Sequence, residues 1–309
     1  MLPDNSPFHK GEKDAQMRVG VRDRIERQGR RMIVDFMPDQ HREFYNQLPT
    51  LFLGSVDENG QPWASVVVGE PGFVTTPSSR QLKVSTPLLQ FDPLSEGLRE
   101  GAQMGVLGLE PHTRRRNRMN GEVGNLTDES FEINVGQSFG NCPQYIQKRR
   151  LTWREPSMLE LQTGSAMSDE VKGIMRSADT FFIATNYDGN GADMSHRGGK
   201  PGFVKIEDGH TFVVPDFRGN NHFNTIGNLL LNPKAGLLFL DYKSGDILYV
   251  AAETEIVWEG PELKAFEGSQ RLLRFKVSEW RLVQGGFPFT SDFMEYSPNL
   301  KKTGEWAGS

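Results

Sequence analysis

The chain has 309 residues, of which 36% are hydrophobic, and carries a net charge of -5. This length suffices for two ordinary domains, and the acidic balance argues against broad nucleic-acid binding through phosphate neutralisation. The single cysteine, Cys142, excludes a disulfide framework and a thiolate metal cluster, and the six histidines lack the spacing of a zinc site. We therefore expect neither a metal centre nor a nucleic-acid partner.

No uninterrupted apolar run reaches the roughly 20 residues that a membrane span requires. The first residues, "MLPDNSPFHKGEKDAQ", are polar and lack the apolar segment of a signal peptide. We expect a soluble cytoplasmic protein without a membrane partner, in which residues 1–29 and 286–309 are terminal extensions.

The predicted elements follow the same plan twice. In residues 30–150 a short helix, "PDQHREFYNQL", precedes an apolar strand, "TLFLGSV", and a later strand, "QMGVLGL". In residues 165–285 the corresponding segments are "SDEVKGIMRSA", "TFFIATN" and "KAGLLFL". Each helix opens with a turn-forming residue and acidic side chains in its first turn, as helix N-termini favour.

An internal duplication explains this plan. Residues 37–74 overlie residues 167–204 without a gap, and the shared period is far longer than that of a solenoid repeat. The identical pairs are Met37/Met167, Asp39/Asp169, Thr50/Thr180, Phe52/Phe182, Ser65/Ser195, Gly69/Gly199, Pro71/Pro201, Gly72/Gly202, Phe73/Phe203 and Val74/Val204. Ordinary residue frequencies would give about two or three such pairs.

Several short strands with one or two helices in each copy predict a mainly β protein made of two tandem closed or split β-barrels. The first copy spans residues 30–150 and the second spans residues 165–285, with a boundary near 150–165.

Two basic segments of the second copy predict an anion site. In "SHRGGK", Ser195, His196, Arg197 and Lys200 lie on or beside a strand. In "VVPDFRGNNHFN", Arg218 and Gly219 lead into Asn220 and Asn221, which should cap the next helix. A helix start offers free N–H groups, arginine offers a fork of donors for phosphate oxygens, and glycine admits a ligand to the main chain.

On these residues alone, an ordinary loop and helix cap is the commoner explanation. The first copy changes the balance because it has Val66 and Val67 opposite His196 and Arg197, and Glu70 opposite Lys200. A structural requirement should be common to both copies, so the basic residues of the second copy favour a ligand. The first copy is expected to lack a phosphate site of its own.

Four segments together resemble a known family. They are "SHRGGKPGFVKI", "VVPDFRGNNHFNTIGNLLLNPKAGLLFL", "GLEPHTRRRNRMNGEV" and "SFGNCPQYIQKR". They look like the flavin-nucleotide-binding relatives of pyridoxamine 5'-phosphate oxidase, and the resemblance covers most of residues 30–260. It implies a split β-barrel that binds FMN between two barrels, normally in a homodimer.

The resemblance also implies residue roles. It assigns Ser195 and Arg197 to the strand beside the flavin, with Arg197 near the phosphate. It assigns Pro215, Asp216, Arg218, Asn220 and Asn221 to the loop that completes the phosphate and ribityl site. The tail "GGFPFTSDFMEYSPNLKKTGEW" does not match the oxidase's substrate-binding segment, so no substrate is predicted.

The end of the first copy would then supply the opposite wall, as the two barrels pair into a pseudo-dimer within the chain. In "NCPQYIQKR", Gln144 could hydrogen-bond a flavin edge and Tyr145 could cover a ring face. We interpret Cys142 as a small buried residue rather than a redox group.

Two further basic features are interpreted conservatively. The run Arg114–Arg118 alternates along a strand and predicts a solvated face or contacts between the barrels rather than a second phosphate site. His196 is interpreted as a surface histidine rather than a proton donor to reduced flavin or substrate.

The leading functional hypothesis is an FMN-dependent oxidoreductase that acts on a small-molecule substrate or electron donor, and no catalytic residue is assigned. The alternatives are a non-catalytic flavin carrier or redox sensor, and a split barrel that holds haem or a deazaflavin. A homodimer of the whole chain also stays open.

Overall fold

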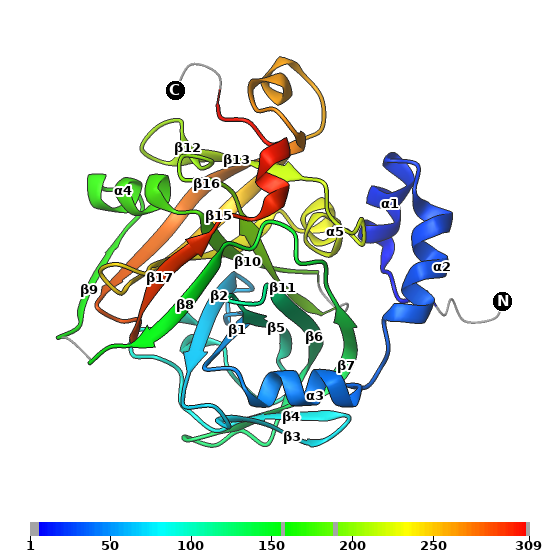
Figure 1. The fold of residues 1–309 in the computed structure, drawn as a ribbon, viewed down its shortest axis with the longest axis vertical. Helices are drawn as coiled ribbons and strands as arrows, with labels where there is room; N and C mark the ends of the chain where they lie inside the picture. The colour runs from blue at the N-terminus through cyan, green and yellow to red at the C-terminus, as the bar shows by residue number, and fades with distance from the viewer. Residues whose placement is uncertain (1–5, 156–157, 188–190, 307–309) are drawn as a thin grey trace.

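The computed structural model describes residues 6–155, 158–187 and 191–306. Parts of the predicted extensions and of the boundary near 150–165 lie outside these residues. The described chain is mainly β and forms two large sheets and one small sheet (Figure 1).

The first sheet has the strand order β2-β1-β5-β6-β7-β4-β3. All neighbouring strands in it are antiparallel. Its strands are β1 (Thr50–Val56), β2 (Pro62–Val68), β3 (Val74–Ser78), β4 (Gln81–Val84), β5 (Gln103–Glu110), β6 (Arg115–Gly124) and β7 (Phe131–Gly140).

The second sheet has the order β11-β10-β14-β15-β16-β13-β12, and β9 (Glu160–Gly164) also pairs with β16. Each strand on the main path takes the place of the strand nine positions earlier in the chain. The strands are β10 (Thr180–Asn186), β11 (Ala192–Gly198), β12 (Lys205–Ile206), β13 (Thr211–Phe217), β14 (Lys234–Asp241), β15 (Asp246–Val257) and β16 (Ser269–Gln284). The shared order confirms the tandem, two-copy split-barrel fold.

The two sheets meet along their equivalent strands. Phe52 of β1 stacks on its counterpart Phe182 of β10, with ring centroids 3.7 Å apart and an interplanar angle of 16°. Close backbone packing continues beside this pair, because a Cβ atom on Gly105 would overlap the main chain of Asp193. Residues of both copies share one hydrophobic cluster at this junction.

Short helices flank the sheets. Helix α3 (Asp39–Asn46) and helix α4 (Asp169–Ser177) lie where the repeat predicts them, and the Ser168 side chain accepts a hydrogen bond from the Val171 N–H. Helix α5 (Asn224–Leu231) follows β13 in the second copy. The first copy has only a short 3-10 turn, η1 (Pro93–Glu96), in the corresponding loop.

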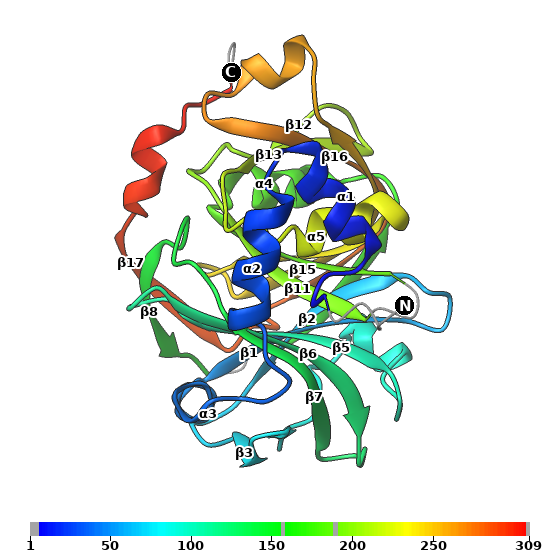
Figure 2. The same ribbon diagram turned by 90° about the vertical axis from the view of Figure 1, so that its right-hand side faces the viewer.

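The terminal segments add structure outside the two repeats. Helices α1 (Lys10–Arg18) and α2 (Arg22–Met32) lie over the α5 side of the molecule (Figure 2). Strand β17 (Phe289–Glu295) pairs with β8 (Lys148–Trp153) and is followed by a short 3-10 turn, η3 (Pro298–Lys302). A further 3-10 turn, η2 (Pro261–Ala265), lies within the second copy, between β15 and β16. Within the described ranges, none of the helices is long and apolar enough to cross a membrane.

Candidate functional site

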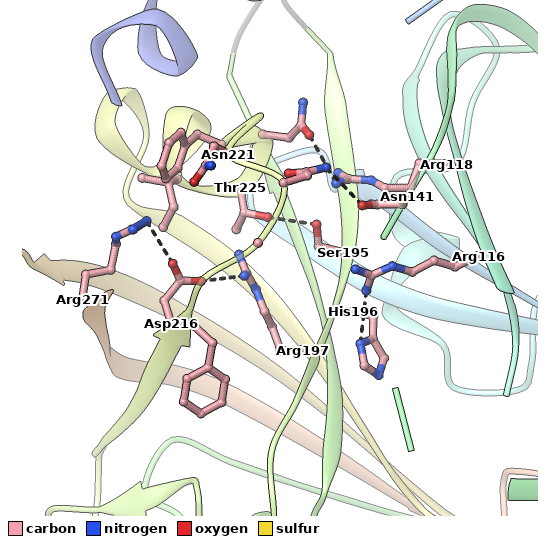
Figure 3. Close-up of a pocket in the computed structure, with 16 residues that line it drawn as sticks. Arg116, Arg118, Asn141, Ser195, His196, Arg197, Asp216, Asn221, Thr225 and Arg271 are labelled. Atoms are coloured by element: carbon pink, nitrogen blue, oxygen red, sulfur yellow. Dashed lines mark hydrogen bonds and ion pairs between the residues drawn. The ribbon is translucent and has the colours of Figure 1, made fainter. Parts of the chain in front are cut away.

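A groove lies between β6 of the first copy and β11 with the loop after β13 of the second copy (Figure 3). Its inner cavity of about 90 Å³ is polar. An outer cavity of about 60 Å³ is more apolar, and shares several lining residues with the inner one. The shared residues are Arg116, His196, Arg197, Phe217 and Gly219.

Arginines from both copies converge on the inner cavity. Arg116 and Arg118 are two residues apart on β6, so both point to the same face of the strand and toward Arg197 of β11. Arg271 of β16 closes the far side. All four guanidinium groups line one small space, which like charges occupy only where the protein or a ligand compensates them.

Two carboxylates compensate part of this charge. Asp216 accepts from Arg197 at 2.6 Å and lies 3.1 Å from the nearest Arg271 nitrogen. Asp193 forms an ion pair with Arg118, and both side chains are buried. Four positive groups therefore face two negative groups, which leaves a net charge near +2 in the wall of the cavity.

Protein partners satisfy the four arginines only in part. The Nε atoms of all four, Arg116, Arg118, Arg197 and Arg271, are buried without a hydrogen-bond acceptor. Burial and the neighbouring arginines lower the pKa of Arg116 to about 10 and that of Arg118 to about 9. Buried donors are normally satisfied, so the cavity has the properties of a site for a dianion.

Hydroxyl and amide groups complete the inner cavity. Ser195 and Thr225 hydroxyls are hydrogen-bonded at 3.0 Å, and the Asn224 amide oxygen accepts from Arg118 at 3.3 Å. Asn141, from the end of the first copy, accepts a hydrogen bond from the Asn220 side chain at 3.1 Å. The first copy thus contributes to the opposite wall of the groove.

The predicted helix start is wrong. Helix α5 begins at Asn224, and neither Asn220 nor Asn221 caps it. Asn221 and Phe223 have left-handed backbone conformations, with φ of 62° and 64°, which interrupt a helix. The Asn220 side chain instead accepts from the His222 N–H at 3.0 Å, forming a local turn within the loop.

His196 is not the predicted surface histidine, because only 6% of it is exposed. Its ring packs edge-on against Phe182, and Nδ1 lies 3.4 Å from an Arg116 nitrogen. Burial and the surrounding arginines lower its pKa well below 6.5. The ring is therefore neutral at neutral pH, and beside an arginine its Nδ1 is placed to accept a hydrogen bond.

The outer cavity is lined by residues that include Gln144, Tyr145 and Pro215. The Tyr145 ring lies 5.0 Å from that of Phe217, and its hydroxyl donates to the Arg218 carbonyl oxygen at 3.2 Å. The Gln144 side-chain oxygen is buried without a donor. Cys142 nearby is half-buried, which corrects its interpretation as a buried residue.

Two residues of the predicted set line neither cavity. Lys200 lies 3.8 Å from Glu305, and the Arg218 side chain is exposed. Sequence reasoning missed Arg116, Arg118, Thr225, Asn141 and Arg271 as lining residues. For Arg118 the predicted contact between barrels is confirmed by its ion pair with Asp193, whereas the solvated face is wrong for this buried side chain.

The alternation of the arginine run was a usable signal. Arg115 points away from the groove and lies over the Phe44 ring at 5.0 Å, while Arg116 and Arg118 on the other face of the strand line the cavity. Only the packing of one barrel on the other shows that this face meets the second copy's loop.

Comparison with solved structures gives similar proteins at low identity. HupZ of Group A Streptococcus is 18% identical, with 36% of this chain and 89% of that chain covered and a TM-score of 0.30. An FMN-binding protein from Syntrophomonas wolfei is 18% identical, with 35% and 78% covered and a TM-score of 0.27. HutZ, the heme storage protein from Vibrio cholerae, is 15% identical, with 40% and 97% covered and a TM-score of 0.28.

No curated protein matches the chain. The family comparison, in contrast, gives two matches to pyridoxamine 5'-phosphate oxidase, over residues 37–160 and 167–284. These stretches cover well over half of the chain, one in each copy of the fold. The chain therefore belongs to the pyridoxamine 5'-phosphate oxidase family.

Proposed function

We propose that the groove binds FMN and that the protein is a flavin-dependent oxidoreductase. The observation that carries this proposal is the buried cluster of four arginines with unpartnered Nε donors, in which two carboxylates form ion pairs with Arg118, Arg197 and Arg271. A terminal phosphate supplies the missing negative charge and acceptor oxygens. Bound flavin would supply hydride and electron transfer, while the protein supplies binding and orientation.

The residues of the groove fit the two ends of this cofactor. Arg116, Arg118, Arg197 and Ser195 would hold the phosphate. Gln144, with its unpartnered oxygen, could accept from a ring N–H, and Tyr145 offers an aromatic surface beside it. Because both copies in one chain line the groove, this proposal requires no second chain to complete the site.

A non-catalytic flavin carrier or redox sensor is the second candidate. It is favoured because, among the described lining residues, neither His196 nor Asp216 is free to act as a general acid or base. The His196 ring is neutral, and Asp216 is held by two arginines. Reduction by NADH or NADPH separates the candidates, because a carrier keeps its flavin oxidised.

The absorption spectrum of the purified protein and mass spectrometry of the released ligand test the cofactor directly. FMN gives two bands in the near-ultraviolet and blue, whereas haem and deazaflavin give different spectra. Titration of the apoprotein should then show FMN binding at least about a hundredfold tighter than riboflavin, because only FMN reaches the arginines. Equal affinity for both flavins, or no uptake of either, contradicts the proposal.

A further inference from the structure

The N-terminal helix α1 belongs to neither barrel copy, yet it is built into the wall behind the inner cavity. A Cβ atom on Gly11 would overlap the Gly227 carbonyl oxygen, so α1 and α5 touch backbone to backbone. The Gln16 side chain also donates to the His222 carbonyl oxygen at 3.0 Å, within the loop that lines the cavity. The position of this loop is therefore coupled to α1.

Glu12 is the point where α1 reaches the arginine cluster. Its carboxylate accepts from the Asn224 amide nitrogen at 2.5 Å and from the His9 N–H at 2.9 Å. The Asn224 oxygen in turn accepts from Arg118 at 3.3 Å. A continuous path of hydrogen bonds thus runs from Glu12 through Asn224 to an arginine of the cavity.

The ionisation state of Glu12 also changes the net charge around the inner cavity. When it is ionised, the net charge of the four arginines and the nearby carboxylates falls from about +2 to about +1. Glu12 is only 4% exposed, and burial raises its pKa to about 7, although Arg118 and Arg22 oppose this shift. It lines a separate cavity of about 350 Å³, which offers a route for proton exchange.

We propose that Glu12 is a positioning residue of the anion pocket, which orients Arg118 through Asn224 and weakens the binding of phosphate or sulfate groups when it is ionised. The inference rests on the proposed function of the arginine cluster as an anion site. Protonation of Glu12 removes one negative charge near the anion, so anion affinity should fall as pH rises from 6 to 8.

Several charged and polar groups surround Glu12, and their protonation between pH 6 and 8 also matters for the test. They are His9 and Lys13 of α1, Arg22 of α2, Arg118 of β6, Asp193 of β11 and Asn224 of α5. Burial lowers the pKa of His9 to about 4, and that of the nearby His222 to about 4. Both histidines therefore stay neutral between pH 6 and 8.

Sulfate is the probe for the test, because it does not titrate between pH 6 and 8. Its affinity for the full chain, measured by calorimetry, should be about tenfold weaker at pH 8 than at pH 6. Glu12→Gln should reduce this change to less than twofold, since the amide stays uncharged. Asp14→Asn is the matched control, because Asp14 is a more exposed carboxylate on the same helix, paired with Lys10 at 3.2 Å.

A second measurement uses the unmodified protein, so it tests the role of Glu12 even if Glu12→Gln does not fold. Calorimetry in two buffers of different ionisation enthalpy should show that the unmodified protein takes up a fraction of a proton when sulfate binds at pH 7. No proton uptake, no sulfate binding, or an unchanged pH dependence in folded Glu12→Gln overturns the inference. Sulfate binding with the expected pH dependence but without FMN binding overturns only the proposed cofactor.

Discussion

The groove and its counterpart in the other half of the molecule share a framework and differ in charge. Ser195 and Arg197 of β11 take the positions that Ser65 and Val67 occupy on β2. The serine is kept in both halves, whereas the arginine is replaced by an apolar side chain.

The facing strand changes in the same way. Arg118 pairs with Leu107 in the first sheet, and Tyr249 pairs with the equivalent Leu238 in the second sheet. Tyr249 therefore takes the place of Arg118, and by the same register Ile247 takes the place of Arg116. The counterpart groove has no arginine at any of these three positions.

Side chains fill the counterpart groove. Asp92, which is buried in the loop that replaces α5, accepts hydrogen bonds from the Ser65 hydroxyl, the Leu94 N–H at 2.9 Å and the Tyr249 hydroxyl at 3.3 Å. The carboxylate is thus supplied from within the chain. The same arrangement of strands therefore leaves a cationic groove open in one half and fills the equivalent groove with the Asp92 side chain in the other half. For this reason we expect each chain to bind one FMN.

The largest effect on FMN affinity should come from replacing two arginines of the groove with the residues found at the equivalent positions of the counterpart groove. Arg116→Ile with Arg197→Val should remove two charge-assisted contacts to the phosphate of the proposed FMN, each contributing about 1.5–3 kcal/mol. FMN affinity should fall by a factor of about a hundred to ten thousand, while riboflavin affinity changes little. Fluorescence titration of the apoprotein measures both. Arg115→Ala, on the opposite face of the same strand, is the control, and FMN binding that survives the double change would misplace the site.

The next largest effect should be on stability, and it comes from the buried ion pair between Arg118 and Asp193. Arg118→Met leaves Asp193 as an uncompensated buried charge, and should lower the free energy of unfolding by about 3–5 kcal/mol. Adding Asp193→Asn should restore most of this loss, because the amide still accepts from Ser195 and Thr225. Urea unfolding of the two variants measures the difference, and equal stability of single and double variants would contradict it.

The buried Asp92 of the counterpart groove should make the stability of the protein depend on pH. Burial raises its pKa to about 6, so the folded state holds a proton more tightly than the unfolded chain, whose Asp titrates near 3.8. Stability should therefore fall by up to about 3 kcal/mol as pH rises from 4 to 6. Asp92→Asn should flatten this part of the curve in urea unfolding between pH 4 and 8. An unchanged slope in the variant would show that another group titrates.

The smallest effect should come from the outer cavity. Tyr145→Phe removes the hydrogen bond to the Arg218 carbonyl oxygen and keeps the ring against Phe217. We expect FMN affinity to fall by about two- to fivefold, from a loss of about 0.5–1 kcal/mol. Tyr296→Phe, at an exposed tyrosine, is the control in the same titration. A loss above a hundredfold would mean that the hydroxyl contacts the ligand directly.

Much of the fold could be predicted because local signals and the repeat agree. Strands β1 and β10 have the predicted bounds, and α4 begins after Ser168, whose side chain caps it. The start of α5 could not be predicted from Asn220 and Asn221, because the backbone of this loop is set by what packs around it. The Gln16 contact to His222, for example, joins residues 206 positions apart.

The site was predictable in part on both sides, since Gln144 and Tyr145, predicted for the opposite wall, line the outer cavity. Arg197 stands out because the first copy has Val67 at its position, whereas Asp216 was assigned from the family resemblance. For Arg118 the alternation of the strand shows which arginines share its face, but only the packing of one barrel on the other shows what that face meets. His196 shows the same limit: polarity predicts exposure, but the strand carrying it turns the ring against Phe182 at the junction of the copies.

The stacked pair Phe52 and Phe182 marks where two equivalent halves meet inside a single polypeptide. In an assembly of identical subunits, every mutation appears in both halves, so a change that spoils one groove spoils its twin. Here each half is encoded separately, and selection can act on them one at a time. The first half is thus free to change independently of the second, and here it contributes Arg116 and Arg118 to its neighbour's groove.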